Sequence, residues 1–317
     1  MDNLRDKIIL GINISHNFSI CIFKNNKVLD FFYEERHILH KKYQPKNLNF
    51  FIISIFKKIN FKPDLVIYSS FQRGEDLKSE VNDEDVIKKI QTQLDNPPFY
   101  FNKTNHHIYH ACSSFYYSNF DKAMAIVIDG GGSYPLGGFY REYESIFFIN
   151  KKNVIKLFQH LSNLRSLYLP KLSNIEEYSN IINNTFIDGV EYYFSSLSLG
   201  GLDFLNSCEK INMETEPGKL MGLSSYAYSN IKYNLNYDFV NIAKKIQEKS
   251  FNKTCELIEK AYSYKKIKNF VLSGGYFLNC SNNFKYVKKF PKFNFFVDPD
   301  PTDGGTALGA CVYYGYK

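Results

Sequence analysis

Two histidines spaced four positions apart are the clearest candidates for chemistry in this sequence. His106 and His110 stand at the start of a segment that is predicted to be helical through Tyr116. On a helix, residues i and i+4 project from the same face, so both imidazole rings can chelate one metal ion. His107 points roughly a quarter-circle away and is not expected to be a ligand. Histidines at this spacing are more often packed in a core than bound to a metal, so further ligands are needed to indicate a site.

Two aspartates at glycine turns supply such ligands. Asp129 ends a predicted strand, Asp303 opens the last predicted helix, and each is followed directly by glycines. Mixed imidazole and carboxylate ligands suit iron(II), manganese or zinc, and the residue types alone do not choose among them. The sequence therefore predicts a metal site with four ligands: His106, His110, Asp129 and Asp303.

Three glycine-rich turns lie at the ends of predicted strands, at 129–132, 273–275 and 303–305. Glycine permits positive φ angles and lets backbone N–H groups approach an anion without a Cβ in the way. The last two turns also precede predicted helices, whose amino-terminal ends favour phosphate. A single glycine pair is usually only a tight turn, but three at equivalent junctions favour a nucleotide cleft.

The elements that must position these residues form a pattern that occurs twice. Residues 7–33 are predicted to form three strands joined by short polar turns, and 123–150 repeat this arrangement with strands at 123–128, 137–140 and 145–150. Each opening leads on to helices and further strands. Helices are expected at 48–59, 85–94, 189–199, 239–251, 253–261, from Leu278 and at 304–314, and strands at 65–69, 154–159, 270–273 and 293–297.

Two lobes that each begin with β-hairpins and continue with a parallel sheet are typical of one α/β fold class. This class is the duplicated actin/sugar-kinase-like (RNase H-like) fold, in which a nucleotide lies in the cleft between the lobes. The predicted domains are a first actin-like lobe over residues 1–121, which includes the metal-binding helix, and a second over 122–317.

Composition is that of a folded protein. The chain has 317 residues, of which 44% are hydrophobic and 22% charged, and this excludes a disordered chain. The net charge of +7 suits a polyanionic partner such as nucleic acid, or a phosphorylated substrate. A lysine-rich chain with a solvated surface accounts for the charge better, because the basic residues are scattered in pairs and no nucleic-acid-binding motif accompanies them.

Cysteine spacing and hydropathy indicate a reducing compartment. The six cysteines are far apart, with no C-x-x-C pair, so neither a disulfide framework nor a zinc site is expected. The amino terminus has no signal-peptide pattern, and no apolar run is long enough to span a membrane. The sequence therefore predicts a cytoplasmic protein with no membrane partner.

The motifs together resemble a known family. The chain is similar to the amino-terminal domain of the O-carbamoyltransferases of the nodulation-factor, cephamycin and tobramycin type, which are relatives of the universal tRNA threonylcarbamoyl transferase. The matching stretches occur in order along almost the entire chain. They are 9–11, 15–17 with Ser19, 34–36, 106–111, 128–130, 218–223 with Tyr226, 272–275, 278–280, and 303–305 with 307–310.

The resemblance implies a reaction. In the family, carbamoyl phosphate and ATP are converted to carbamoyl adenylate, and the actin-like domain passes the carbamoyl group to an acceptor hydroxyl. The two histidines and two aspartates would then hold the metal, which the resemblance implies is iron(II), and the metal would act as a Lewis acid. Asp129 would thus serve the catalytic step as well as the metal.

The resemblance also assigns roles to other residues. The adenylate and its phosphates would lie against Gly130, Gly131, Gly274, Gly275, Asn279 and Gly304. Lys219 would lie near the phosphates, with a surface lysine as the alternative. His16 would be the general base for the acceptor hydroxyl, because an imidazole titrates near working pH. The family has Asp after this histidine, and here Asn17 replaces it, so the charge that would stabilise an imidazolium is missing.

One departure from the family concerns length. Family members usually continue into a carboxy-terminal YrdC-like domain that makes carbamoyl adenylate, and this chain ends at Lys317 without it. Three alternatives are open: a separate subunit supplies the intermediate, the compact protein works without it, or the sequence is a truncation.

Other functions are compatible with the same motifs. A tRNA threonylcarbamoyl transferase shares the two-histidine helix and the final aspartate, and a non-catalytic or kinase-like nucleotide-binding module shares the fold. The acceptor is also open. It is either a sugar or other small molecule or a hydroxymethylated base in DNA, such as 5-hydroxymethylcytosine, which would have to be flipped out of the duplex.

Overall fold

The computed structural model describes most of the chain, and every structural statement below concerns that part. The described residues are 6–15, 17–38, 55, 62–70, 83–135, 140–163, 216–228 and 237–315. The predicted helices at 48–59 and 189–199 lie outside these ranges, apart from Ile55.

The first sheet has five strands in the order β3-β2-β1-β4-β5. Strands β1, β2 and β3 pair antiparallel, whereas β4 and β5 continue parallel to β1. Strand β1 is fully buried, as expected for a central strand covered on both faces. The strands are β1 (Ile9–Asn13), β2 (Ser19–Lys24), β3 (Lys27–Tyr33), β4 (Leu65–Ser69) and β5 (Phe99–Phe101).

The second sheet repeats this topology, with the order β8-β7-β6-β9-β10. Strands β6, β7 and β8 pair antiparallel, and β9 and β10 run parallel to β6. Each strand of the first sheet thus has a counterpart at the same place in the second, which confirms the predicted duplication. The strands are β6 (Lys122–Ile128), β7 (Tyr140–Asn150), β8 (Val154–Asn163), β9 (Asn269–Ser273) and β10 (Asn294–Val297).

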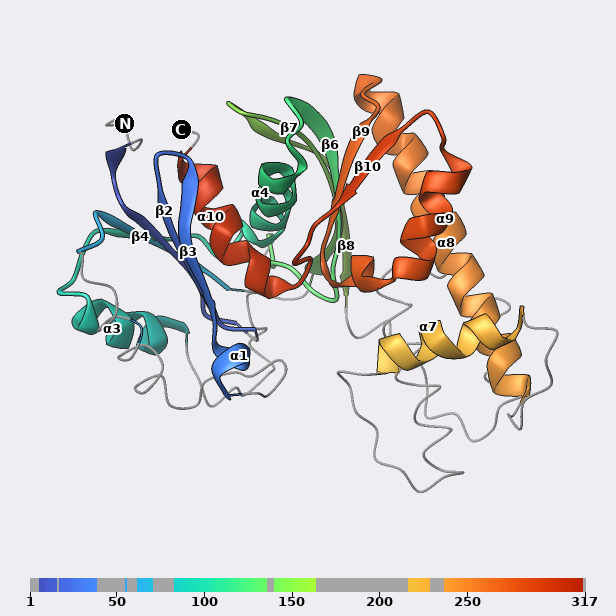
Figure 1. Cartoon of the computed structure of the whole chain (residues 1–317), viewed down its shortest axis with the longest axis horizontal. Coiled ribbons are helices and arrows are strands. Elements are labelled where there is room, and N and C mark those ends of the chain that lie inside the picture. Colours follow the sequence, from blue (N-terminus) through green and yellow to red (C-terminus); the bar gives the residue numbers. More distant parts are fainter. Residues whose placement is uncertain are drawn as a thin grey trace.

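Two helices fill the space between the sheets (Figure 1). Helix α4 (His106–Ser118) packs on the second sheet, and α10 (Thr306–Gly315) packs on the first and against α4. The two backbones approach so closely that a Cβ at Gly309 would overlap the carbonyl oxygen of Tyr109. Helix α4, which precedes the predicted domain boundary at 121/122, thus packs on the second sheet, and α10, which follows it, packs on the first. The boundary itself stays a prediction.

The outer faces of the sheets are covered by other helices. Helix α3 (Asp83–Gln93) contributes Val86, Ile87 and Ile90 to the core on the outer face of the first sheet. Helix α8 (Tyr237–Lys265) covers the outer face of the second sheet. The remaining helices are α1 (Glu34–Ile38), α7 (Glu216–Tyr226) and α9 (Cys280–Lys289), with short 3-10 turns at Gly275–Leu278 and Asp303–Gly305.

Two sequence-based boundaries differ from the structure. The helices expected at 239–251 and 253–261 are one helix, α8, because no proline or glycine separates them and buried apolar residues continue through both halves. Tyr140 and the predicted strand at 145–150 lie on one strand, β7, rather than on two. Within the described residues, no helix is both long enough and apolar enough to cross a bilayer.

Candidate metal centre

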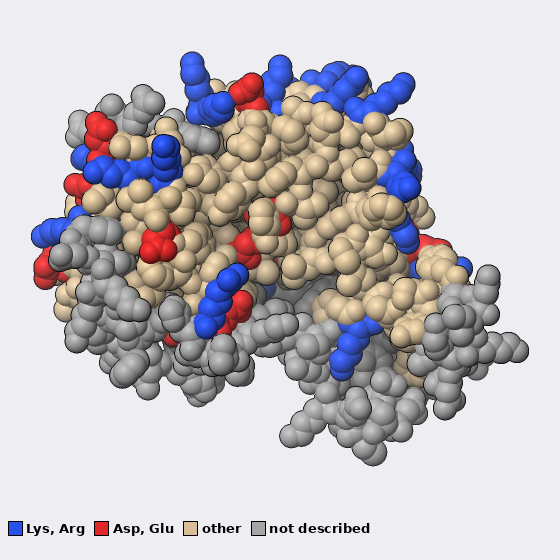
Figure 2. Space-filling model, in the orientation of Figure 1, with Lys and Arg blue, Asp and Glu red and all other residues tan. Residues whose placement is uncertain are grey.

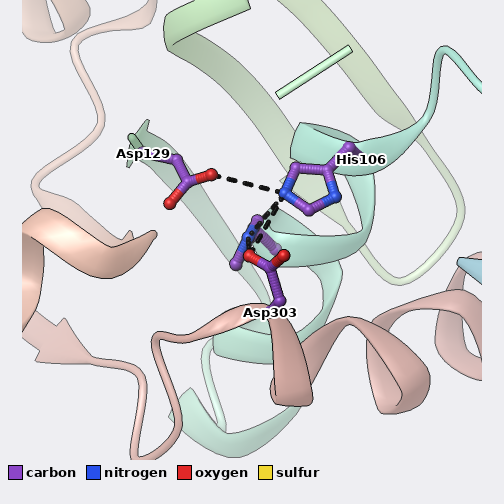
Figure 3. Close-up of side chains that lie close together, drawn as sticks. His106, Asp129 and Asp303 are labelled. Atoms are coloured by element: carbon purple, nitrogen blue, oxygen red, sulfur yellow. Dashed lines mark hydrogen bonds and ion pairs between the residues drawn. The ribbon is translucent and has the colours of Figure 1, made fainter. Parts of the chain in front are cut away.

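The four predicted metal ligands come together where three elements meet. His106 is the first residue of α4 and His110 lies one turn later; Asp129 directly follows β6, and Asp303 begins the 3-10 turn before α10. One ligand atom from each side chain lies within 4.8 Å of all the others, and in the described part of the chain this is the one such group of His, Cys, Asp and Glu. Figure 3 shows His106, Asp129 and Asp303 converging on a common point.

The distances define a compact cluster. The Nε2 atom of His106 lies 3.4 Å from an oxygen of Asp129 and 3.5 Å from an oxygen of Asp303. The Nε2 atom of His110 lies 3.6 Å from the same Asp303 oxygen and 3.2 Å from Nε2 of His106. Two imidazole nitrogens and two carboxylates directed at one point fit a divalent cation, since this is the mixed donor set expected for iron(II), manganese or zinc.

Burial and charge support the same conclusion. Both histidines are at most 1% exposed, and Asp129 and Asp303 are 8% and 3% exposed. Burial alone would lower the pKa of His106. The negative charges of Asp303 and Asp129, and their hydrogen bonds with the His106 ring, outweigh burial and raise this pKa to about 10. Burial opposes ionisation of Asp129 as well, yet the hydrogen bond and charge of His106 hold its pKa far below the usual range. The cluster therefore attracts positive charge strongly.

The glycine turns hold Asp129 in place. Its two oxygens accept from the backbone N–H groups of Gly275, at 3.2 Å, and Gly131, at 3.4 Å. Gly274 has a φ of 97°, and a Cβ there would overlap the carbonyl oxygen of Ile128 at the end of β6. Glycine is thus required where the turn after β9 meets the strand that carries Asp129.

The other predicted phosphate-binding glycines differ in their surroundings. Gly130 is exposed, and nothing lies within 4 Å of the position that a Cβ would take. A Cβ at Gly131 would meet the guanidinium of Arg141, which donates to the carbonyl oxygens of Gly131 and Gly132. At Gly304 a Cβ would meet the ring of Tyr33, so close packing already accounts for that glycine. Gly130 is therefore the position most open to a ligand.

Three further predicted residues lie elsewhere or are not described. The side chain of Asn279 is 5% exposed, caps α9 by accepting from the backbone of Asn282, and pairs with Gln247. Lys219 is an exposed residue of α7. His16 falls outside the described residues, and its neighbour Asn17 donates to Glu35 at 3.1 Å. The roles assigned to these residues stay predictions.

A buried ion cluster beside the metal centre was not predicted from sequence. His107 contacts Ser145 at 2.9 Å and lies 3.7 Å from Glu142, which is fully buried and accepts from Lys156 at 2.7 Å. His107 therefore points away from the four ligands, as predicted. Glu142 and Lys156 lie on β7 and β8, and their spacing along the sequence carries no signal that they pair.

Comparison with known proteins identifies what the fold is similar to. A family model described as "Carbamoyltransferase N-terminus" matches residues 35–312. The structure of full-length HypF in its phosphate- and nucleotide-bound form is similar with a TM-score of 0.62 and 16% identity, over 98% of this chain and 56% of that one. The structure of HypF from T. kodakarensis gives 0.59 and 15%, over 98% and 48%. No curated protein matches the sequence.

These likenesses confirm the predicted fold class. At such low identities they establish the fold and not the activity. The chain spans about half the length of the two HypF structures, since it covers 56% and 48% of them.

Proposed function

Because the chain belongs to the carbamoyltransferase family defined by the amino-terminal domain, we propose that it transfers a carbamoyl group to an acceptor hydroxyl with the help of a divalent metal ion. The observation that carries this proposal is the convergence of two imidazoles and two carboxylates within 4.8 Å. A nucleotide-binding module without catalytic function does not need a group of two histidines and two aspartates. A kinase-like module does not need two histidine ligands either.

Each residue of the centre has a part in the mechanism. His106, His110, Asp129 and Asp303 would hold the metal, for which we propose iron(II). When bound, the metal would act as a Lewis acid on carbamoyl or phosphate oxygens. The backbone N–H groups of Gly131 and Gly275 orient Asp129, and Ser15 donates to Asp303 at 2.8 Å. Burial of the ligands keeps bulk water from competing for the ion.

We place the activated carbamoyl donor against the glycine turns. The donor is carbamoyl adenylate, formed from carbamoyl phosphate and ATP, either by this chain or by a separate subunit. Support comes from Gly130, which adjoins Asp129 and has open space over its Cα, and from the name of the similar HypF structure, which was obtained with phosphate and nucleotide bound. In this proposal Lys219 contacts the phosphates, and Asn279 lines the adenylate pocket.

The transfer step joins the acceptor oxygen to the carbamoyl carbon. A new C–O bond forms, the C–O bond from the carbamoyl carbon to the adenylate phosphate breaks, and AMP leaves. The acceptor proton passes to a base, for which His16 is the proposed residue. Asn17, the next residue in the sequence, donates to the carboxylate of Glu35 at 3.1 Å.

A hydroxyl on a sugar or another small molecule is the first proposed acceptor, and a hydroxymethylated base in DNA is the second. The net charge of +7 motivates the second. On the face in Figure 2, the described Lys and Arg side chains lie mainly along the edges, and the centre is mostly uncharged. On this face, the described side chains form no basic groove that would favour DNA over a small acceptor.

The test supplies every reactant that the proposal names. Purified protein with iron(II) is incubated without oxygen with synthetic carbamoyl adenylate, or with ATP and carbamoyl phosphate. The acceptors are aminoglycosides, DNA that contains 5-hydroxymethylcytosine, and, with threonylcarbamoyl adenylate, tRNA. Mass spectrometry should detect a carbamoyl adduct on one hydroxyl acceptor, and the H106A/H110A protein should not form it.

Supplying carbamoyl adenylate directly removes the dependence on a separate subunit. Absence of any adduct from a protein that binds the metal would contradict the proposal. Modification of tRNA alone would instead identify a threonylcarbamoyl transferase.

A further inference from the structure

The second ring nitrogen of His110 makes a contact that the four-ligand site does not explain. The Nε2 atom of His110 faces His106 and Asp303, whereas its Nδ1 atom lies 3.3 Å from the hydroxyl oxygen of Ser273. Ser273 is the last residue of β9 and is fully buried. The ring of His110 is thus held between the metal centre and the end of a central strand.

The hydroxyl of Ser273 is itself held by a buried carboxylate. It donates to the Oδ2 atom of Asp298 at 2.9 Å. A serine hydroxyl has one hydrogen to donate, so towards His110 it must accept. Burial raises the pKa of Asp298 to about 7. When Asp298 is ionised, His110 carries its hydrogen on Nδ1, which leaves the lone pair of Nε2 directed at the metal centre.

The position of Asp298 is fixed by the sheet. It directly follows β10, and its backbone N–H donates to Leu272, the residue before Ser273, at 2.9 Å. Its Oδ1 atom accepts from the backbone N–H of Asp300 at 3.1 Å. Both carboxylate oxygens are therefore engaged, and the side chain is only 3% exposed. Placing a carboxylate in the core is costly, and the hydrogen bonds from Ser273 and Asp300 offset part of that cost.

The two ligand histidines differ in this respect. Within the described residues, the Nδ1 atom of His106 is buried and has no hydrogen-bond partner. Of the two, only His110 has a hydrogen-bond partner, Ser273, on the ring nitrogen that faces away from the metal centre. A carboxylate that fixes a metal-binding histidine through a hydrogen bond is a general way to raise its basicity and hold its geometry.

We propose that Ser273 and Asp298 are positioning residues that hold His110 ready to bind the metal through Nε2. The chain of contacts runs from Asp298 through Ser273 to His110. It rests on the proposed metal centre, but it is independent of the acceptor and of the carbamoyl chemistry.

Two substitutions test the contact at different atoms. Ser273→Ala removes the hydroxyl from the chain. Asp298→Asn keeps the shape, but its amide must turn an NH₂ group towards either Ser273 or the backbone N–H of Asp300, both of which donate to Asp298. Ser250→Ala is the matched control, because Ser250 is also fully buried and donates to a backbone carbonyl of α8.

The measurement is metal binding by the full chain, with cobalt(II) as a spectroscopic probe and manganese(II) in competition with a chelator. We expect both test variants to bind about 10–100-fold more weakly than the unchanged protein. The visible spectrum of bound cobalt(II) should also change in them, which a merely structural role would not produce. The Ser250→Ala protein should match the unchanged protein in both readouts.

The outcomes separate the two proposals. If the unchanged protein binds no metal, the metal centre of the proposed function fails, and this inference fails with it. If the unchanged protein binds cobalt(II) and both test variants give the same affinity and spectrum, only the role of Ser273 and Asp298 is wrong. Urea unfolding of each variant confirms that it is folded before binding is measured.

Discussion

At the scale of the residue, a proton and the proposed metal ion would compete for His106. The carboxylates of Asp303 and Asp129 raise the pKa of His106 to about 10, against the opposite effect of burial, so His106 is protonated near neutral pH in the metal-free protein. A metal must displace this proton, and its binding should therefore weaken as the pH falls. We expect the affinity for manganese(II) to rise about tenfold per pH unit from about pH 7 to about pH 9, and to level off above about pH 10.

Calorimetry in two buffers of different ionisation enthalpy checks this expectation at about pH 8. The difference between the two enthalpies should correspond to the release of about one proton per metal ion bound. An affinity that does not change with pH would mean that His106 is already neutral, and that the two aspartates do not act on it as the distances indicate.

Asp303 is the candidate ligand that lies close to both histidines. One of its oxygens lies 3.5 Å from Nε2 of His106 and 3.6 Å from Nε2 of His110. Asp303→Asn keeps the shape and removes the charge, so we expect manganese(II) to bind at least about 100-fold more weakly, or about 2.7 kcal/mol. The pKa of His106 should fall in the same variant, and NMR titration of the ring measures this.

Asp121→Asn is the control for that substitution. Asp121 is an exposed residue paired with Lys151, and it lies at the opposite end of β6 from Asp129, so neither manganese(II) affinity nor the His106 titration should change. Equal losses in the two variants would point to a general effect of charge rather than to a ligand.

From the residue types, the sequence could single out the four candidate ligands, but not the groups that contact them. The spacing of His106 and His110 and the glycines after each aspartate are local signals, and the structure brings these four side chains together. Ser273 and Asp298 carry no such signal, because a serine and an aspartate on neighbouring parallel strands become partners only once the strand register is known. The same is true of Glu142 and Lys156.

At the scale of the element, the contact between α4 and α10 sets the geometry of the metal centre. A Cβ at Gly309 would overlap the carbonyl oxygen of Tyr109, which is one residue before His110. Gly309→Ala should therefore push the helices apart and destabilise the protein by about 3 kcal/mol. Because Asp303 lies just before α10, the same change should weaken metal binding.

A second glycine gives the matched comparison. Gly222 lies inside α7, and nothing is within 4 Å of the position of its Cβ. Gly222→Ala should stabilise the protein by about 0.5–1 kcal/mol, because alanine is the better helix former. Urea unfolding of both variants measures the difference, and similar effects at the two positions would refute the close approach at Gly309.

Elements with a clear periodic pattern could be predicted, and elements defined by tertiary contacts could not. The strands of the first half, over 9–33 and at Leu65–Ser69, agree with the sequence because their apolar residues form compact runs between polar turns. In the second half, the hairpin expected between 137–140 and 145–150 is wrong, because Tyr140 and 145–150 belong to the one strand β7. Strand β5 has three residues, of which Phe99 and Tyr100 are half-exposed, and it is a strand only because β4 pairs with it. The single long helix α8 shows that a short gap between two apolar segments does not end a helix unless a proline or glycine lies in the gap.

At the scale of the whole molecule, the candidate metal centre lies where the two halves of the fold meet. His106 and His110 belong to the helix packed on the second sheet, and Asp303 precedes the helix packed on the first. Figure 1 shows these two helices side by side between the sheets. An ion held by all four ligands is therefore a cross-link between elements that are distant in sequence.

This arrangement predicts that metal binding stabilises the entire fold. An ion that binds only the folded protein adds about 2.7 kcal/mol of stability when its free concentration is 100 times the dissociation constant. For a protein of this size we expect the melting temperature to rise by several degrees with manganese(II), and to return when a chelator is added. The Asp303→Asn protein should show little of this rise, because it lacks the charge that joins α10 to the histidines. If Asp303→Asn were stabilised as much as the unchanged protein, the ion would have to bind at another place, and the link between the two halves would not exist.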